Sequence, residues 1–359
     1  MQLLNQDGDE GLGLGGVAGL RERRNFGNSK QLKRHSGGTE MGRPDMRSAA
    51  EPTRNLLIVH TPNFQDISDW HSVKHRIDEK APDIEVRIAT NGARNSVTRR
   101  WQGSRPSLVF SPFVLREYQP NGGTVYACQA FSKLEQIERL ARHGLPVPLT
   151  ATLTRDLAVD PARWGRYVVA KPARSSSGGR SIYLVQTTDL FARYAELTLN
   201  DTREMVIQPY IDHTENGYLT DYRVLTMLGH VLYAARNWSA VPRRALEEIA
   251  ADREGIIASN DKRFGRLRTL CNDAEIIALG EQAHAAFPQC SVLGVDLVRD
   301  AETRKLYIME VNPAGATWHF SSMSSKGYPA EHVRNLYAQF GALDKVAQLL
   351  IEKTREEAN

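Results

Sequence analysis

The sequence has few cysteines and no long apolar run. Its 359 residues include three cysteines, Cys128, Cys271 and Cys290, and no C-x-x-C pair. This odd, scattered set argues against a disulfide framework or a zinc site. No apolar stretch of about 18 residues occurs, and the first residues lack the order of charged, apolar and small side chains that marks a signal peptide. We therefore expect a reduced, cytoplasmic protein without membrane association.

Long runs of one charge sign are also missing. Lys and Arg number 46 against 42 Asp and Glu, for a formal net charge of +4. This excess is weak evidence for nucleic acid, which we do not expect as a partner, and a pocket for nucleotide phosphates explains it equally well. Hydrophobic residues at 41% and charged residues at 25% exclude collagen-like, coiled-coil and wholly disordered classes. The length allows two or three subdomains, each with its own apolar core.

Aromatic side chains are nearly absent from the first 50 residues. This part combines a glycine-rich tract at 11–16 with scattered Arg, Lys, Ser and Asp. Such a composition cannot bury enough surface to offset the entropy lost on ordering. Residues 1–54 are therefore predicted to form a disordered tail.

A change of pattern begins at Leu56. Leu56–His60 and Leu108–Phe110 are short apolar runs with β-branching, typical of buried parallel strands. A further candidate strand lies at Glu85–Ile88, and Asp66–Glu79 has the pattern of a helix. This β-α-β alternation predicts a small open α/β domain at residues 55–130.

A helix followed by a β-rich unit comes next. Ser132 and Glu135 are spaced as a capping box, and Gly144 supplies the stop. Three short strands are then predicted, at Tyr167–Ala170, Ile182–Val185 and Met205–Gln208. Residues 131–207 are predicted to form a second, smaller subdomain.

The last part, residues 208–359, is predicted to mix strands and helices. Gly229 separates two apolar runs in the manner of a hairpin. Between Trp238 and Arg268 we find no pattern that points to a substrate. The expected elements are strands at Tyr222–Leu228, His230–Ala235, Leu293–Val298 and Leu306–Val311, and a helix at Asp273–Phe287.

Polar side chains interrupt the last two of these strands. Glu310 and Asn312, two residues apart, share one face of their strand, and antiparallel pairing would place Asp296 beside them. Carboxylate and amide oxygens suit Mg²⁺ carried by nucleotide phosphates. Each residue alone is more often an exposed polar group, but the three together in apolar strands favour a metal site.

A second candidate is the loop that begins at Lys171. This lysine ends a strand and precedes Ser175–Gly179, in which Ser177, Gly178 and Gly179 could offer donors to phosphates without side-chain bulk. An exposed hairpin turn explains a Ser/Gly loop more often. The loop is not a Walker P-loop, because the Gly-Lys-Ser/Thr ending and a following helix are absent.

Two further features are ambiguous by themselves. The connector Gln208, Pro209, Tyr210, Ile211 can offer backbone groups and apolar contact to an adenine ring, and an ordinary apolar linker explains it equally well. Lys133 lies near a helix start, where a solvated lysine is commonplace.

Taken together and in this order, the motifs resemble the ATP-grasp superfamily, in particular the glutathione-synthetase and ribosomal-protein glutamate-ligase type. The resemblance runs from Phe131 to about Phe320 and extends more weakly back to Leu56. It implies an α/β (α+β) ATP-grasp fold. Its parts would be an open α/β pre-ATP-grasp domain at 55–130, a β-rich lid at 131–207 and a C-terminal metal- and nucleotide-binding subdomain at 208–359.

The resemblance also implies roles for single residues. Lys133 and Lys171 would contact nucleotide phosphates, Ser177, Gly178 and Gly179 would belong to a mobile flap, and Gln208, Pro209, Tyr210 and Ile211 would form the adenine hinge. Asp221 and Arg223 match an Asp-x-Arg strand start, and Arg236 matches a basic residue that faces the phosphates. Asp296, Glu310 and Asn312 would be the metal ligands, with Lys171 and Arg236 stabilising charge during catalysis.

The implied activity is ATP-dependent ligation of a carboxylate to an amine or thiol through an acylphosphate, with ATP and Mg²⁺, or Mn²⁺ in its place. Trp318 and His319 are candidates for the substrate side, although packing explains them as well. The alternative activity is an ATP-grasp kinase that phosphorylates a hydroxyl group. A binding module without turnover is disfavoured, because the metal ligands and both lysines are present. The sequence specifies neither the substrates nor whether the chain forms a homo-oligomer.

Overall fold

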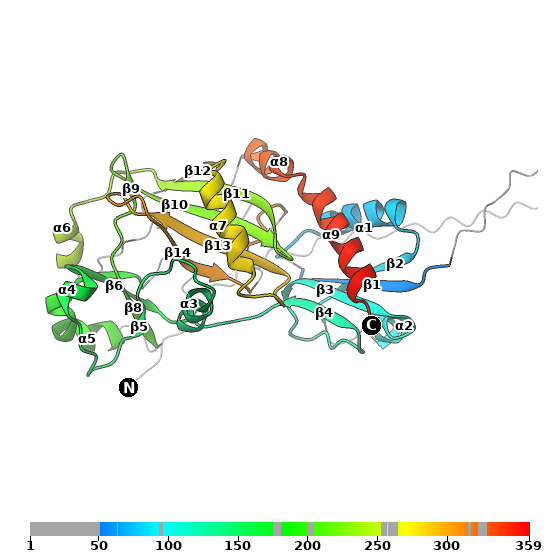
Figure 1. Cartoon of the computed structure of the whole chain (residues 1–359), viewed down its shortest axis with the longest axis horizontal. Helices are drawn as coiled ribbons and strands as arrows, with labels where there is room; N and C mark the ends of the chain where they lie inside the picture. The colour runs from blue at the N-terminus through cyan, green and yellow to red at the C-terminus, as the bar shows by residue number, and fades with distance from the viewer. Residues whose placement is uncertain are drawn as a thin grey trace, which may run out of the picture. The chain divides into compact units, whose positions relative to one another are not determined.

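The computed structural model describes residues 51–62, 64–92, 96–174, 181–199, 204–252, 257, 265–314, 317–321 and 329–359. Within this part, the chain forms three sheets with their helices (Figure 1). Most of the predicted tail, and Ser177, Gly178 and Gly179 of the predicted flap, lie outside the described residues. Among the helices described, none has the length and apolar character needed to cross a membrane.

The first sheet is parallel throughout, in the order β2-β1-β3-β4. Its strands are β1 (Arg54–His60), β2 (Ile84–Thr90), β3 (Ser107–Val114) and β4 (Thr124–Cys128). Both faces are covered, as in other parallel sheets. Leu56 and Ile58 join one core cluster, whereas Leu57 and Val59 join another on the opposite face.

Helices from both ends of the described chain cover this sheet. The helices are α1 (Ile67–Lys80), α2 (Ser96–Gln102) and α9 (Ala342–Glu357). In Figure 1, α9 in red runs beside α1 in blue, and both contribute to the core that includes Leu56. Residues 342–357 therefore pack with the first sheet, although the sequence boundaries group them with the third subdomain.

The second sheet is small and antiparallel, in the order β5-β8-β6-β7. It consists of β5 (Ala151–Thr152), β6 (Tyr167–Pro172), β7 (Tyr183–Gln186) and β8 (Met205–Pro209), with helices α4 (Pro161–Trp164) and α5 (Leu190–Leu199) and the short 3₁₀ turn η2 (Thr187–Asp189). Leu153, Val168 and Leu197 belong to its own apolar cluster. We call this unit, residues 146–209, the lid.

The third sheet is the largest and antiparallel, in the order β12-β11-β10-β13-β14 with β9 beside β10. Its strands are β9 (Thr214–Glu215), β10 (Tyr218–Met227), β11 (His230–Ser239), β12 (Arg266–Leu270), β13 (Val292–Arg299) and β14 (Leu306–Asn312). The predicted hairpin is confirmed, and Leu228 and Gly229 at its turn both have positive φ, of 48° and 89°. Glycine adopts this conformation without the penalty that a Cβ brings.

Helices line this third sheet. They are α3 (Lys133–Arg142), α6 (Leu246–Ala251), α7 (Ala274–His284) and α8 (Ala330–Gln339). The capping box of Ser132 and Glu135 is present at the start of α3. Apolar residues of α7 pack against one face of the sheet. Helix α6 instead packs toward the lid, where Ile249 joins Tyr167 and Leu184.

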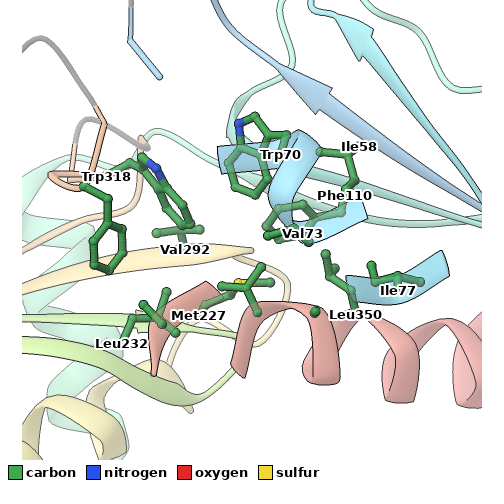
Figure 2. Packing of buried hydrophobic residues seen from close by; sticks show 14 of the residues in the cluster. Ile58, Trp70, Val73, Ile77, Phe110, Met227, Leu232, Val292, Trp318 and Leu350 are labelled. Carbon is green, nitrogen blue, oxygen red and sulfur yellow. The ribbon is translucent and has the colours of Figure 1, made fainter. Parts of the chain in front are cut away.

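The opposite face of the third sheet shares a core with the first sheet. Met227, Leu232 and Val292 at the ends of β10, β11 and β13 pack in one cluster with Trp70 and Leu350 (Figure 2). All five side chains are fully shielded from solvent. An apolar core of this kind resists deformation and joins the two sheets into one unit. We call the first and third sheets with their helices the body.

Candidate active site

Three strands bring charged side chains into one row. Arg223 on β10 lies opposite Asp296 on β13, which in turn lies opposite Glu310 on β14. Side chains at laterally paired positions point to the same face of a sheet. The antiparallel pairing expected from the sequence therefore places both carboxylates side by side, on the face away from α7.

Asp296 is the centre of this row. Both oxygens of its carboxylate accept hydrogen bonds from Arg223, from Nε at Oδ1 and from Nη2 at Oδ2 (2.8 Å). Asn312 Nδ2 also donates to Asp296 Oδ2, at 2.9 Å. Asn312 lies opposite Gly294, where a Cβ would stand 2.3 Å from Cγ2 of Thr317. The glycine thus leaves room for the segment that follows Asn312 to fold back over the strands.

Two lysines from other elements approach the same carboxylates. Lys133, the first residue of α3, forms an ion pair with Glu310 at 3.0 Å. Lys171 extends from β6 of the lid and is buried. Its charge environment contains Glu310, Lys133 and Asp296. The two predicted phosphate contacts therefore lie beside the same carboxylates.

Burial changes the acid–base properties of this group. Desolvation lowers the pKa of Lys171 to about 8, with the charge of Lys133 acting in the same direction and Glu310 opposing it. Desolvation also raises the pKa of Asp296 above its ordinary value, although Arg223 lies against it. An anionic ligand would favour the protonated form of Lys171.

The carboxylates face a cavity between the lid and the third sheet, whose empty space, including the part open to solvent, is about 850 Å³. The predicted hinge, Gln208, Pro209, Tyr210 and Ile211, lines it together with Lys171, Asp221, Arg223, Asp296 and Glu310. The side-chain oxygen Oε1 of Gln208 is buried there with no hydrogen-bond partner among the described residues, whereas its Nε2 donates to Thr150 at 2.9 Å. An unpaired buried acceptor is costly, so the cavity suits a ligand with an N–H donor.

The structure does not bring Arg236 to this group. Arg236 lies opposite Tyr222, and so points to the other face of the sheet from Arg223. Its Nη2 forms an ion pair with Glu215 at 2.6 Å, and its guanidinium lies over the ring of Trp238. The role that the resemblance implies for Arg236 has no counterpart in this geometry.

Two other arginines, which were not predicted as site residues, lie on the cavity-facing side of the sheet. Arg266 on β12 lines the cavity and forms an ion pair with Asp221 at 3.0 Å. Arg268 lies two residues farther along the same face, with Nε donating to Asn237 at 2.6 Å. The alternation Arg266-x-Arg268 was the available signal, but strand β12 was not predicted.

His319 completes this face of the site. Its ring is buried and stacks on Tyr233, with 6.0 Å between ring centroids. Burial, followed by the charges of Arg223, Arg268 and Arg266, holds the pKa of His319 well below its ordinary value. Arg268 Nη1 lies 3.2 Å from Nδ1, and since arginine only donates, the hydrogen-bond network assigns the ring hydrogen of the neutral imidazole to Nε2.

Comparisons with known proteins point to one fold. No protein-family model matches the sequence, and no curated protein matches it. Among solved structures, the ATP-grasp ligase PsnB complexed with a minimal precursor is 14% identical, with a TM-score of 0.50 over 85% of this chain and 100% of that chain. A RiPP-associated ATP-grasp ligase from Chryseobacterium gregarium, in complex with ADP and a leader and core peptide, is 16% identical. Its TM-score is 0.50 over 84% of this chain and 97% of that chain.

The chain has the ATP-grasp fold. This confirms the fold class expected from the sequence, with the lid and the third sheet as the two walls of the cavity.

An ATP-grasp fold implies Mg²⁺, and the residues present fit this ion. Asp296 and Glu310 lie opposite each other, and the pKa of Asp296 is raised chiefly by desolvation, with smaller contributions from the charges of Asp221 and Glu310. A divalent cation relieves such repulsion. Among the described residues, no cluster of three or more His, Cys, Asp or Glu could hold a metal, but Mg²⁺ is commonly held by one or two carboxylates, waters and substrate phosphates.

Proposed function

We propose that the protein is an ATP-dependent ligase that joins a carboxylate to an amine or thiol. The observation that carries this proposal is the row Arg223, Asp296, Glu310, with Lys133 and Lys171 beside it, at the mouth of a cavity lined by the hinge. Two carboxylates facing two lysines and an arginine is the arrangement that a magnesium–nucleotide complex requires. The fold shared with ATP-grasp ligases supports the same activity.

In the proposed first step, a carboxylate oxygen of the substrate attacks the γ-phosphorus of ATP, and the bond to the β-phosphate breaks to release ADP. Asp296, Glu310 and Asn312 would hold Mg²⁺, which when bound neutralises phosphate charge. Lys133 and Lys171 would hold the phosphate oxygens from α3 and from the lid. Fixed charges aimed at developing charge lower the barrier without needing a proton transfer.

In the proposed second step, the amine or thiol attacks the carbonyl carbon of the acylphosphate. The new C–N or C–S bond forms, the C–O bond to phosphate breaks to release inorganic phosphate, and the proton of the nucleophile passes to solvent. Arg266, which lines the cavity, and Arg268, two residues farther along the same face of β12, would hold the carboxylate-bearing substrate. Guanidinium groups suit carboxylates because they can donate two parallel hydrogen bonds.

The substrate can belong to a peptide. PsnB is complexed with a minimal precursor, and the ligase from Chryseobacterium gregarium is in complex with a leader and core peptide. We therefore include peptide side-chain and terminal carboxylates among the candidates, beside small carboxylic acids.

The properties of His319 disfavour the kinase alternative. Phosphorylation of a neutral hydroxyl gains from a positioned general base, whereas a carboxylate is already ionised near neutral pH. His319 lies against Arg268 and Tyr233, and its pKa lies well below its ordinary value. An imidazole of low pKa is a weak base, so ligation fits this site better than hydroxyl phosphorylation.

The test is to incubate the full chain with MgATP, hydroxylamine and pools of carboxylic acids and peptides. We expect ADP release together with a hydroxamate, because hydroxylamine captures an acylphosphate. At a saturating concentration of the carboxylate, His319→Ala should leave the rate of this half-reaction within about tenfold of wild type. A stable phosphate ester that forms from an alcohol, and that His319→Ala abolishes, would establish the kinase instead.

A further inference from the structure

A buried carboxylate outside the nucleotide cavity joins three parts of the chain. Asp69, in the first turn of α1, accepts a hydrogen bond from Trp318 Nε1 at 2.9 Å and another from Ser321 Oγ, both at Oδ2. Its Oδ1 accepts one from Tyr337 Oη of α8, at 2.7 Å. Asp69 thus ties the helix that covers the first sheet to the segment that follows Asn312.

Within the described part of the chain, the side chains that donate hydrogen bonds to Asp69 are all neutral. Burial and the charge of Asp69 raise the pKa of Tyr337 above its ordinary value, so this hydroxyl stays protonated and donates. A buried charge is costly, and apolar packing of similar volume is often at least as stable. Apolar side chains surround this position, since Trp318 packs on Trp70 with 4.7 Å between ring centroids (Figure 2). What the carboxylate adds is three directional bonds, which define position.

The tied segment packs on the strands that carry the site residues. Thr317 O accepts from Tyr233 Oη at 3.1 Å, and the methyl group of Thr317 occupies the space left by Gly294. The residue after Trp318 is His319, which contacts Arg268 and Tyr233. The backbone between Thr317 and Ser321 is therefore fixed on one side by β11 and on the other by Asp69.

We propose that Asp69 is a positioning residue for ligation. Through Trp318 it holds His319 against Arg268, and it thereby determines the position at which the carboxylate substrate binds. Asp69 does not line the nucleotide cavity and acts only through this segment. This proposal rests on the proposed function for its effect on substrate, whereas the mechanical tie is independent of it.

The test uses Asp69→Asn, whose amide N–H₂ would face at least one of the three donors. The matched control is Asp344→Asn. Asp344 pairs with Arg76 of α1 at 3.0 Å, so this change removes a contact of the same helix without touching the segment. Tyr337→Phe, which removes one of the three bonds, is the second variant if Asp69→Asn does not fold.

Three measurements are compared in these variants. Hydrogen exchange of residues 317–321 should be at least about tenfold faster in Asp69→Asn, and faster to a smaller degree in Tyr337→Phe. Calorimetry should give a dissociation constant for Mg·ADP within about threefold of wild type. The Michaelis constant for the carboxylate that scores in the hydroxamate screen should rise at least about tenfold, with that for ATP within about threefold. Asp344→Asn should leave all three unchanged.

Unchanged exchange at 317–321 would overturn the tie. Faster exchange with an unchanged Michaelis constant for the carboxylate, or with constants for ATP and carboxylate that rise together, would overturn the positioning role and leave Asp69 a structural residue. If the wild type neither binds Mg·ADP nor forms a hydroxamate, the proposed function fails, and with it the role in ligation, while the exchange data still decide the tie.

Discussion

The two junctions of the third sheet differ in what fills them. On the same face of β10, Asp221 and Arg223 meet the lid across a cavity, whereas Leu225 and Met227 meet the first sheet in a closed apolar core. The face thus changes from charged to apolar within a few residues of one strand. The junction with the first sheet is a closed apolar core, whereas the junction with the lid combines a cavity with a smaller apolar cluster around Tyr167 and Ile249. We call the second the open junction.

This difference assigns separate tasks to the two junctions. The closed core fixes the strands of the proposed metal ligands relative to α1 and α9, because a close-packed interior transmits strain without yielding. The lid has its own apolar cluster, so it can shift as a unit when a nucleotide fills the cavity. Closure should therefore move Lys171 and the hinge toward Asp296 and Glu310, and leave the body unchanged.

Removing charge from the open junction should have the largest effect. Glu310→Gln removes the negative charge of a proposed metal ligand, which also forms an ion pair with Lys133. We expect MgATP-dependent turnover to fall about 100-fold or more, as when one preorganised electrostatic contact is lost. The control is Glu302→Gln, in the turn that joins β13 and β14. Wild-type turnover by a folded Glu310→Gln would remove this residue from the site.

Cavities in the two cores should separate the body from the lid. Leu350 in the closed junction and Leu197 in the lid are both almost fully buried. Leu350→Ala should lower the free energy of unfolding of the body by about 3 kcal/mol, because a buried cavity remains. Leu197→Ala should accelerate hydrogen exchange in the lid and leave the unfolding midpoint of the body nearly unchanged. Equal shifts of one common midpoint would show a single cooperative unit.

The open junction should be sensitive to pH through Lys171. The pKa of this lysine is lowered to about 8, so its ammonium group is charged below that pH and neutral above it. An anionic ligand binds the charged form, so the dissociation constant for Mg·ADP should rise about tenfold from pH 7 to pH 9. Lys171→Arg, which keeps its charge over this range, should give a flat profile. A wild-type profile as flat as that of the arginine variant would contradict the placement of Lys171 at the phosphates.

The smallest expected effect compares two arginines on opposite faces. Arg266 lines the cavity, whereas Arg236 pairs with Glu215 on the face away from it. Arg266→Gln should raise the Michaelis constant of ATP or carboxylate about fivefold, and Arg236→Gln should change either by less than about twofold. The reverse order would return Arg236 to the site and show that the open junction extends around the sheet.

Much of this arrangement could be predicted from local patterns. The capping box of Ser132 and Glu135 predicted α3, and polar residues within apolar strands predicted the row on β13 and β14. These signals work because they depend on neighbours in sequence. The hinge and Lys171 were predicted from the order of the motifs along the chain. Both line the cavity in the structure.

The remainder depends on pairing that the sequence does not show. The register of β10 and β11 shifts between Leu225 and Thr226, and a one-residue shift of this kind exchanges the faces of a strand. The face of Arg236 was therefore not predictable by counting from Gly229. Similarly, the apolar positions of α9 are periodic, but nothing in residues 342–357 indicates that they pack on the first sheet.

The most direct measurement of the central claim is hydrogen exchange of the full chain with and without Mg·ADP. We predict slower exchange on both walls of the open junction, at residues 167–172 and 205–209 of the lid, at residues 210 and 211 of the hinge, and at 292–298 of β13. We predict no change in the first sheet, at residues 54–60 and 107–114. Protection confined to the first sheet, with none at Lys171 or the hinge, would contradict this claim.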